Sequence, residues 1–145
     1  MRASLQLALF GRVALAAGLG YLIGLERQLR GKAAGDRTFA LLAMGAAALV
    51  AMAIELFPLS ADRVIQGVAT GVGFLGAGVI FRRTERPRGL TTAAAAWAAT
   101  AIGVLCGARL YLFAGLTTAL TILLLESIAL PGLARFEGET DQSED

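Results

Sequence analysis

Residues 71–76 read GVGFLG and fit the G-x-G-x-x-G fingerprint with which a Rossmann fold binds the pyrophosphate of a dinucleotide. That fingerprint also needs a preceding strand, a following helix and an acidic residue about 20 positions further on, which binds the ribose. Between Glu85 and Glu126 the sequence has no carboxylate. The sequence therefore argues against a dinucleotide site, and the glycines need another explanation.

Three carboxylates, Glu26, Asp36 and Glu126, could hold a Mg²⁺ ion, which proteins commonly bind through one or two carboxylates and several retained waters. Arginines are abundant around the same positions, so ion pairing is the alternative. The chain has no histidine, which removes the commonest transition-metal ligand and the usual general base. We expect no enzyme, and either ion pairs or a Mg²⁺ site at these carboxylates.

The elements that position these residues are apolar. The chain has 145 residues, of which 57% are hydrophobic and 17% charged, and the charges cluster in short blocks. Between the blocks lie runs of about the 17–25 residues that a helix needs to cross a bilayer. Five such runs occur, at about 5–25, 38–57, 64–81, 91–107 and 110–129.

The sequence thus predicts an all-α membrane bundle of five transmembrane helices within one domain, residues 1–131. The acidic tail at 132–145 is expected to be disordered. We expect the lipid bilayer as the main surrounding, and neither nucleic acid nor a dinucleotide as partner.

Basic residues predict the orientation of the bundle, because basic loops are not readily translocated. The loop after the first run and the loop at 82–90 are both rich in arginine. The alternate connections offer only Arg63 and Arg109. Five spans with the two basic loops inside place the N-terminus outside and the C-terminus in the cytoplasm.

Arg12 is the deepest charge, about two helical turns inside the predicted outer end of the first span. Glu55 lies near the outer end of the second span. Charges at membrane depth are costly and are candidates for function. Arg12 could reach outward along its apolar stem, and we predict that Glu55 pairs with Arg12 or Arg109.

Glycines of the third span fall on two faces of a helical wheel at about 100° per residue. One face carries Gly67, Gly71 and Gly78, and the other carries Gly73 and Gly76. Small residues let membrane helices approach closely, which strengthens van der Waals packing. We therefore predict that this span is the central helix, with neighbours on both glycine faces and Val72 facing lipid.

Three segments carry a family resemblance: GLERQLRGKAAGDRT at 24–38, GVGFLGAGVIFR at 71–82 and RGLTTAAAAWAATAIGVLCG at 88–107. They resemble the signature segments of the MgtC/SapB family of bacterial inner-membrane proteins. The resemblance implies five transmembrane helices, a role in growth under magnesium limitation and, in pathogens, survival inside phagocytes. It also implies that Glu26 and Arg27 are functionally important and that Cys106 matches a cysteine of the family. From the resemblance we expect the short, SapB-like form, which lacks the C-terminal domain of long members.

Two functions remain open. The resemblance implies a regulator that binds other membrane proteins, such as the proton-translocating ATP synthase. The alternative is a transporter or channel for Mg²⁺ or another cation, which would need polar groups near the bilayer midplane. The candidates are Gln66, Thr70, Thr100, Thr117, Thr118 and Thr121. Because threonines in such helices commonly bond to their own backbone, we favour the regulator, and we expect a homodimer formed through small-residue surfaces of the third and fourth spans.

Overall fold

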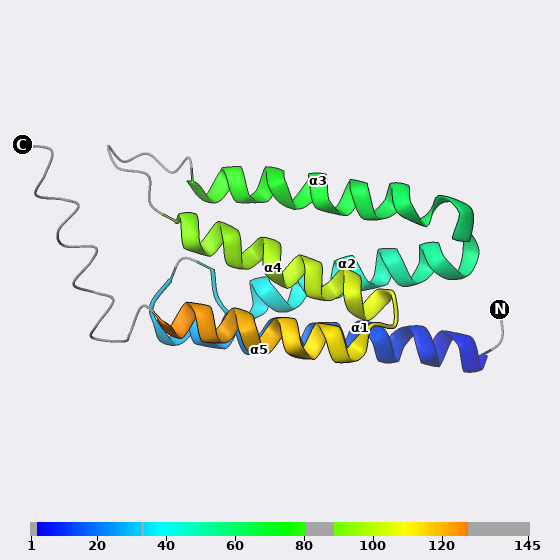
Figure 1. The fold of residues 1–145 in the computed structure, drawn as a ribbon, viewed down its shortest axis with the longest axis horizontal. Coiled ribbons are helices and arrows are strands. Elements are labelled where there is room, and N and C mark those ends of the chain that lie inside the picture. The colour runs from blue at the N-terminus through cyan, green and yellow to red at the C-terminus, as the bar shows by residue number, and fades with distance from the viewer. Residues whose placement is uncertain (1–2, 33, 81–88, 128–145) are drawn as a thin grey trace, which may run out of the picture.

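The computed structural model describes residues 3–32, 34–80 and 89–127 (Figure 1). These ranges form five α-helices and one short 3₁₀ turn, so the all-α prediction is confirmed for the described part of the chain. The elements are α1 (Ala3–Leu29), α2 (Asp36–Leu56), η1 (Pro58–Ser60), α3 (Ala61–Ile80), α4 (Leu90–Gly107) and α5 (Tyr111–Ser127). The residues expected to form the acidic tail lie outside the described residues.

Helix α1 continues beyond its apolar run, to Leu29. Hydropathy marks where the apolar part of a span ends, whereas a helix continues until its last turn is capped. Here Gly31, at φ 64°, adopts the left-handed conformation, and the Lys32 amide donates to the Arg27 carbonyl at 3.0 Å. This is the Schellman arrangement that commonly ends a helix at a glycine. The cap keeps Glu26 and Arg27 inside regular helix.

Helices α1, α2 and α4 are long and apolar enough to cross a membrane by length and composition within the described residues, and α5 is a shorter apolar helix. Helix α3 carries Asp62 and Arg63 in its first turn and is not among the candidate spans found within the described residues. The count of five spans and the sides on which the termini lie stay predictions.

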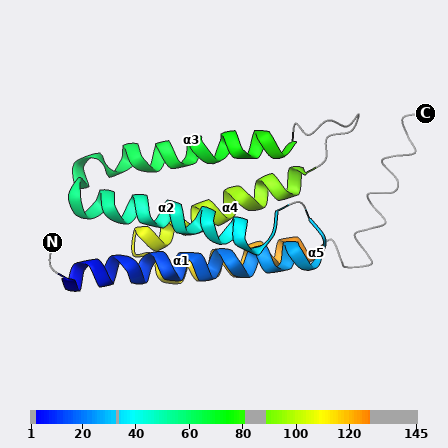
Figure 2. The same cartoon turned by 180° about the vertical axis from the view of Figure 1, so that it is seen from behind.

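Helices α1 and α2 lie on one side of the bundle, α4 and α5 lie on the other, and α3 runs along one edge (Figures 1 and 2). Helix α4 contacts each of the other four helices. Its buried surface consists largely of small residues, among them Ala95, Ala99 and Gly103. The prediction that the third span is central is therefore wrong, because the alanine-rich fourth helix holds that place.

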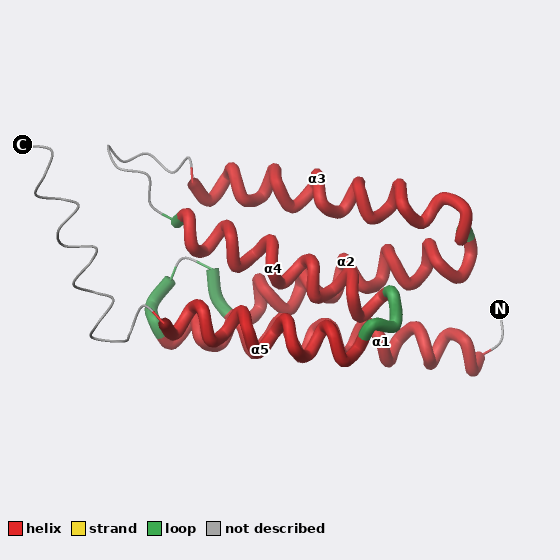
Figure 3. The backbone as a smooth tube through the Cα atoms, viewed as in Figure 1, coloured by secondary structure: helices red, strands yellow, loops and turns green. Residues whose placement is uncertain are grey.

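Helix α3 lies at one edge of the bundle, where it contacts α4, α2 and η1 (Figure 3). Val72, expected to face lipid, is only 5% exposed and packs toward the bundle. A valine buries more apolar surface than a glycine, and the smooth alanine surface of α4 already permits close approach. Val72 of α3 thus packs inward instead of facing lipid.

Five glycines of α3 were predicted to pack against neighbouring helices. None of them makes a tight contact within the described chain. A Cβ atom added at four of them would meet nothing within 4 Å, and one at Gly76 would meet the Ala93 Cβ at an ordinary 3.7 Å. The four are Gly67, Gly71, Gly73 and Gly78.

The close helix contacts use two other G-x-x-x-G pairs. An added Cβ at Gly20 would lie 2.5 Å from the Phe39 carbonyl oxygen, and one at Gly24 would lie 2.5 Å from the Asp36 Cα. On α4, an added Cβ at Gly103 would overlap the Ala43 backbone, and one at Gly107 would lie 2.9 Å from the Ala47 carbonyl oxygen. Helix α2 is therefore held between a glycine pair of α1 and a glycine pair of α4.

Candidate functional site

One cluster of ionised side chains lies where α1, α2 and the end of α4 meet. The buried Arg12 Nη2 lies 2.9 Å from the Glu55 Oε1, and its Nη1 donates to the Gly107 carbonyl at 3.3 Å. Arg109 donates to the same Glu55 Oε1. The predicted pairing of Glu55 is confirmed with both arginines, and Arg12 is turned inward at 5% exposure. We call Arg12, Glu55 and Arg109 the outer cluster.

Arg109 reaches Glu55 from an unusual backbone conformation. Its φ of 66° is the only positive value of a non-glycine residue in the described chain. The Leu110 amide donates to the Leu105 carbonyl at 2.9 Å, so Arg109 occupies the position that Gly31 occupies at the end of α1. A side chain there costs roughly 1–2 kcal/mol. The contact with Glu55 offsets part of that cost.

A second cluster lies where the ends of α1 and α5 meet. Glu26 and Arg27 are buried, and the Arg27 Nη1 donates to the Glu26 Oε2 at 3.4 Å. The Arg30 Nε lies 2.7 Å from the Glu26 Oε1, and the Arg30 Nη2 pairs with Glu126. The Arg30 contact with Glu26 is a close approach of charges, since the Glu26 Oε1 receives no aligned hydrogen bond from the described residues. We call Glu26, Arg27, Arg30 and Glu126 the inner cluster.

The geometry of the inner cluster bears on whether the carboxylates form ion pairs or a Mg²⁺ site. The Arg30 guanidinium lies between Glu26 and Glu126, where a shared cation would have to bind. Asp36 does not join them, because its Oδ1 accepts from the Arg37 amide at 2.7 Å in the first turn of α2, where a helix favours negative charge. The described residues contain no group of three or more His, Cys, Asp or Glu that could hold a metal ion. Ion pairing, not a three-carboxylate Mg²⁺ site, fits this geometry.

Arg30 is the member of the inner cluster that the sequence reasoning did not single out. The sequence does contain a signal for Arg30. Glu26 and Arg30 are four residues apart, which is the spacing at which opposite charges meet on a helix.

Cys106 is buried in the core beside Ala99 and Ile102 and forms no disulfide. It lies on the inward face of α4, directly before the tightly packed Gly107. Its environment is apolar, so in this structure it serves as a small core residue.

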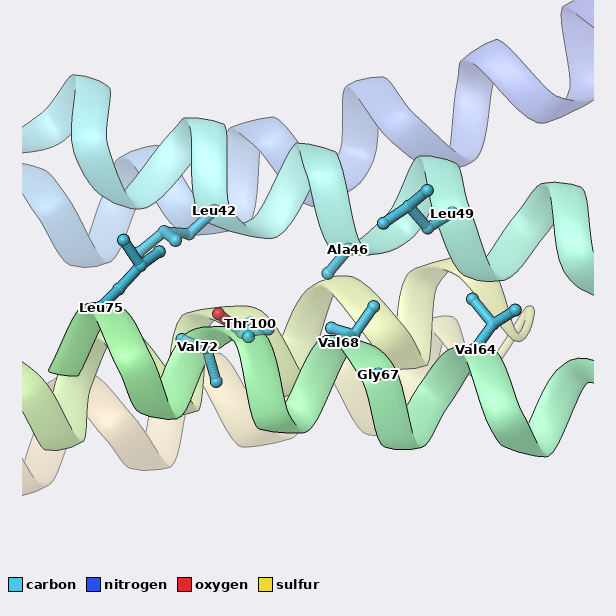
Figure 4. A pocket seen from close by; sticks show the side chains of 10 residues that line it. Leu42, Ala46, Leu49, Val64, Gly67, Val68, Val72, Leu75 and Thr100 are labelled. Carbon is cyan, nitrogen blue, oxygen red and sulfur yellow. The ribbon is translucent and has the colours of Figure 1, made fainter. Parts of the chain in front are cut away.

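Two apolar grooves run along the two sides of α3. The α2–α3 groove, of about 420 Å³, lies between Leu42, Ala46 and Leu49 of α2 and Val64, Gly67 and Leu75 of α3 (Figure 4). The α3–α5 groove, of about 320 Å³, is lined by residues such as Val72, Trp97 and Phe113. The side chain of Thr100 reaches both grooves. The α2–α3 groove is therefore apolar except for the Thr100 hydroxyl, and the α3–α5 groove is apolar except for the hydroxyls of Thr100 and Thr117.

The hydroxyl groups of the five candidate threonines are satisfied within their own helices. Five threonines each donate to the carbonyl four residues earlier in the same helix, over distances of 2.7 to 2.9 Å. They are Thr70, Thr100, Thr117, Thr118 and Thr121. The expectation that these threonines bond to their own backbone is confirmed.

Comparison with known proteins identifies the family of this chain. The MgtC family model matches residues 13–130. Protein MgtC of Salmonella typhimurium (strain 14028s) is 51% identical over 89 residues, which cover 61% of this chain and 38% of that protein. Protein MgtC of Brucella abortus (strain 2308) is 47% identical over 105 residues, which cover 72% of this chain and 44% of that protein. The chain thus spans less than half the length of these relatives, and no solved structure matches it. Since the family model covers well over half of its residues, this chain belongs to the MgtC family.

Proposed function

We propose that this chain is a multi-pass protein of the bacterial inner membrane that supports growth under magnesium limitation by binding and modulating other membrane proteins. Membership of the MgtC family and the relatives named Protein MgtC support this assignment. In a pathogen the same activity would serve virulence. The family resemblance favours the proton-translocating ATP synthase as one partner.

The observation that carries the proposal is the state of the polar groups inside the bundle. A conduction pathway for a cation needs oxygen ligands that are free to replace its hydration shell. The five threonine hydroxyls instead donate to their own helices, and the grooves that two of them line are apolar. These features favour a binding protein over a transporter or channel for Mg²⁺ or another cation.

The grooves suit a transmembrane helix of a partner. Ala46 and Gly67 line the α2–α3 groove, and the larger Leu49 and Leu75 line it as well (Figure 4). Small residues permit the close backbone approach on which helix association in lipid depends. A partner helix seated between α2 and α3 would gain such contacts on both sides.

In this proposal Glu26 and Arg27 act by holding the helix ends together, not as metal ligands. Glu26 contacts Arg30, and Arg30 contacts Glu126 of α5. The chain of contacts fixes α1 relative to α5 and so keeps the shape of the surface that a partner meets.

Filling the α2–α3 groove tests the proposal in cells. We expect Leu75→Trp, produced in a bacterium that lacks its own family member, to lose most support of growth in low-magnesium medium, because the indole occupies the groove. The control is Leu120→Trp on α5, which has similar exposure, 55% against 52% for Leu75, and lines neither groove. It should grow like the unmodified chain.

Membrane abundance of both variants is measured by immunoblot, so that a loss of protein is separated from a loss of activity. Equal growth of the two variants at equal abundance would contradict the role of the groove.

A further inference from the structure

The side of α3 that points away from α4 carries a seam of residues at the spacing of paired helices. Arg63, Gln66, Thr70, Gly73 and Ala77 follow one another at intervals of three and four, which places them on one face. Val72, which packs against the bundle, lies about half a turn away from Thr70 at about 100° per residue. Beside the seam, Phe74 is 81% exposed. We call these five residues the α3 seam.

The seam is polar where lipid would otherwise cover it. The Thr70 hydroxyl is satisfied by the Gln66 carbonyl at 2.9 Å, but the Gln66 side-chain amide bonds to none of the described residues. A side-chain amide left unpaired in hydrocarbon is costly, and membrane helices commonly pair such groups with each other. An amide donates and accepts, so Gln66 is complementary to a second Gln66.

The charges at the start of α3 are complementary to a second copy as well. Asp62 and Arg63 are exposed, and neither is ion-paired within the described part of the chain. Two copies inserted in the same orientation are related by a two-fold axis along the membrane normal, so their α3 helices run parallel. With this spacing Arg63 takes an a position of a parallel pair, where its side chain packs beside the preceding position of the facing helix. Each Arg63 would therefore meet the Asp62 of the other copy at the same depth.

We propose that a second copy of this chain packs on the α3 seam and forms a two-fold dimer. The partner buries Gln66 against Gln66 and forms two Asp62–Arg63 pairs between copies. Gly73 in the seam allows the helices to approach closely, which gives a glycine without contacts in the single chain a role. No seam residue lines either groove, so the dimer leaves both grooves open. This inference goes beyond the proposed function and does not depend on it.

Cysteine cross-linking in native membranes tests the interface, with the full chain carrying Cys106→Ala. We expect Thr70→Cys to form a disulfide-linked dimer on mild oxidation, and Leu120→Cys on α5 to stay monomeric. Cross-linking at Leu120 as efficient as at Thr70 would overturn the proposal, as would a monomer in membranes and in mild detergent.

Charge reversal tests the pairing itself. In the Thr70→Cys background, Asp62→Arg and Arg63→Asp should each reduce the cross-linked fraction by about tenfold, because like charges then face each other. The double variant Asp62→Arg/Arg63→Asp should restore it, since the pairs are re-formed with their signs exchanged. Both residues are exposed in the single chain, so the fold does not depend on them. A double variant that stays as low as the single variants would overturn the proposed pairing.

Discussion

Gly103→Ala is expected to destabilise the bundle strongly, although it adds a single methyl group. The new Cβ would overlap the Ala43 backbone of α2, which cannot rotate away as a flexible side chain could. Relief would require α2 and α4 to separate, and α4 is the helix that contacts every other one. Overpacking of this kind costs typically about 1–3 kcal/mol, and the rigid backbone contact places this site at the upper end. Thermal unfolding of the purified protein in mild detergent measures the effect.

Gly45→Ala on α2 is the matched control, because an added Cβ there meets nothing within 4 Å. Replacing a helix-interior glycine by alanine improves helix propensity by up to about 1 kcal/mol, so this variant should unfold at the same or a higher temperature. If both variants lost stability equally, the close contact between α2 and α4 would be wrong.

Glu55→Gln is expected to give the second large loss. Glu55 is the shared partner of Arg12 and Arg109, and its replacement leaves the Arg12 guanidinium buried with the Gly107 carbonyl and a neutral amide. A buried charge without a counter-charge is strongly destabilising. The thermal midpoint in mild detergent should therefore fall clearly, together with the amount of folded protein recovered from membranes.

Arg109→Gly is the control. It removes the exposed partner of Glu55 and leaves the buried Arg12 paired with that carboxylate. The Arg109 side chain is half exposed, so its ion pair contributes little, and glycine relieves the strain of a positive φ. We expect only a small change in the thermal midpoint. A loss as large as that of Glu55→Gln would show that the outer cluster does not depend on the burial of Arg12.

The sequence predicted the helices well, because hydropathy and charge blocks report directly on which segments are apolar. It also predicted the partners of Glu55, because few basic residues share the depth of that carboxylate. The place of α3 was wrong for a physical reason. A G-x-x-x-G pair shows that another helix could approach closely. It does not show which helix does so, or whether that helix belongs to the same chain or to a second copy.

The pairs that do form close contacts, Gly20 with Gly24 and Gly103 with Gly107, have the same pattern as Gly67 with Gly71. What separates them is the backbone of α2, which lies against both, and sequence spacing carries no such information. The carboxylates show the same limit. The sequence offers Glu26, Asp36 and Glu126 as ligands of one Mg²⁺ site, but whether they face each other depends on the rotation of each helix. The structure turns Asp36 to its own helix start and puts Arg30 between the other two.

The inner and outer clusters together give the bundle fixed ends around an apolar middle. The outer cluster ties α1 to α2 and to the end of α4, and the inner cluster ties α1 to α5. Helix α3 takes part in neither cluster within the described residues. A partner that modulates or is modulated by this protein would therefore meet four helices joined by ion pairs and an α3 that is held by packing within the described residues.

The central claim is that the protein acts on other membrane proteins and does not itself conduct cations. Its most direct test is Mg²⁺ entry into proteoliposomes that contain only this chain, followed with an enclosed magnesium-sensitive dye under an imposed gradient and membrane potential. A reconstituted magnesium channel serves as the positive control. We predict entry no faster than into empty liposomes, and the same result with other cations. Entry that rises in proportion to the amount of folded protein in the vesicles would contradict the account.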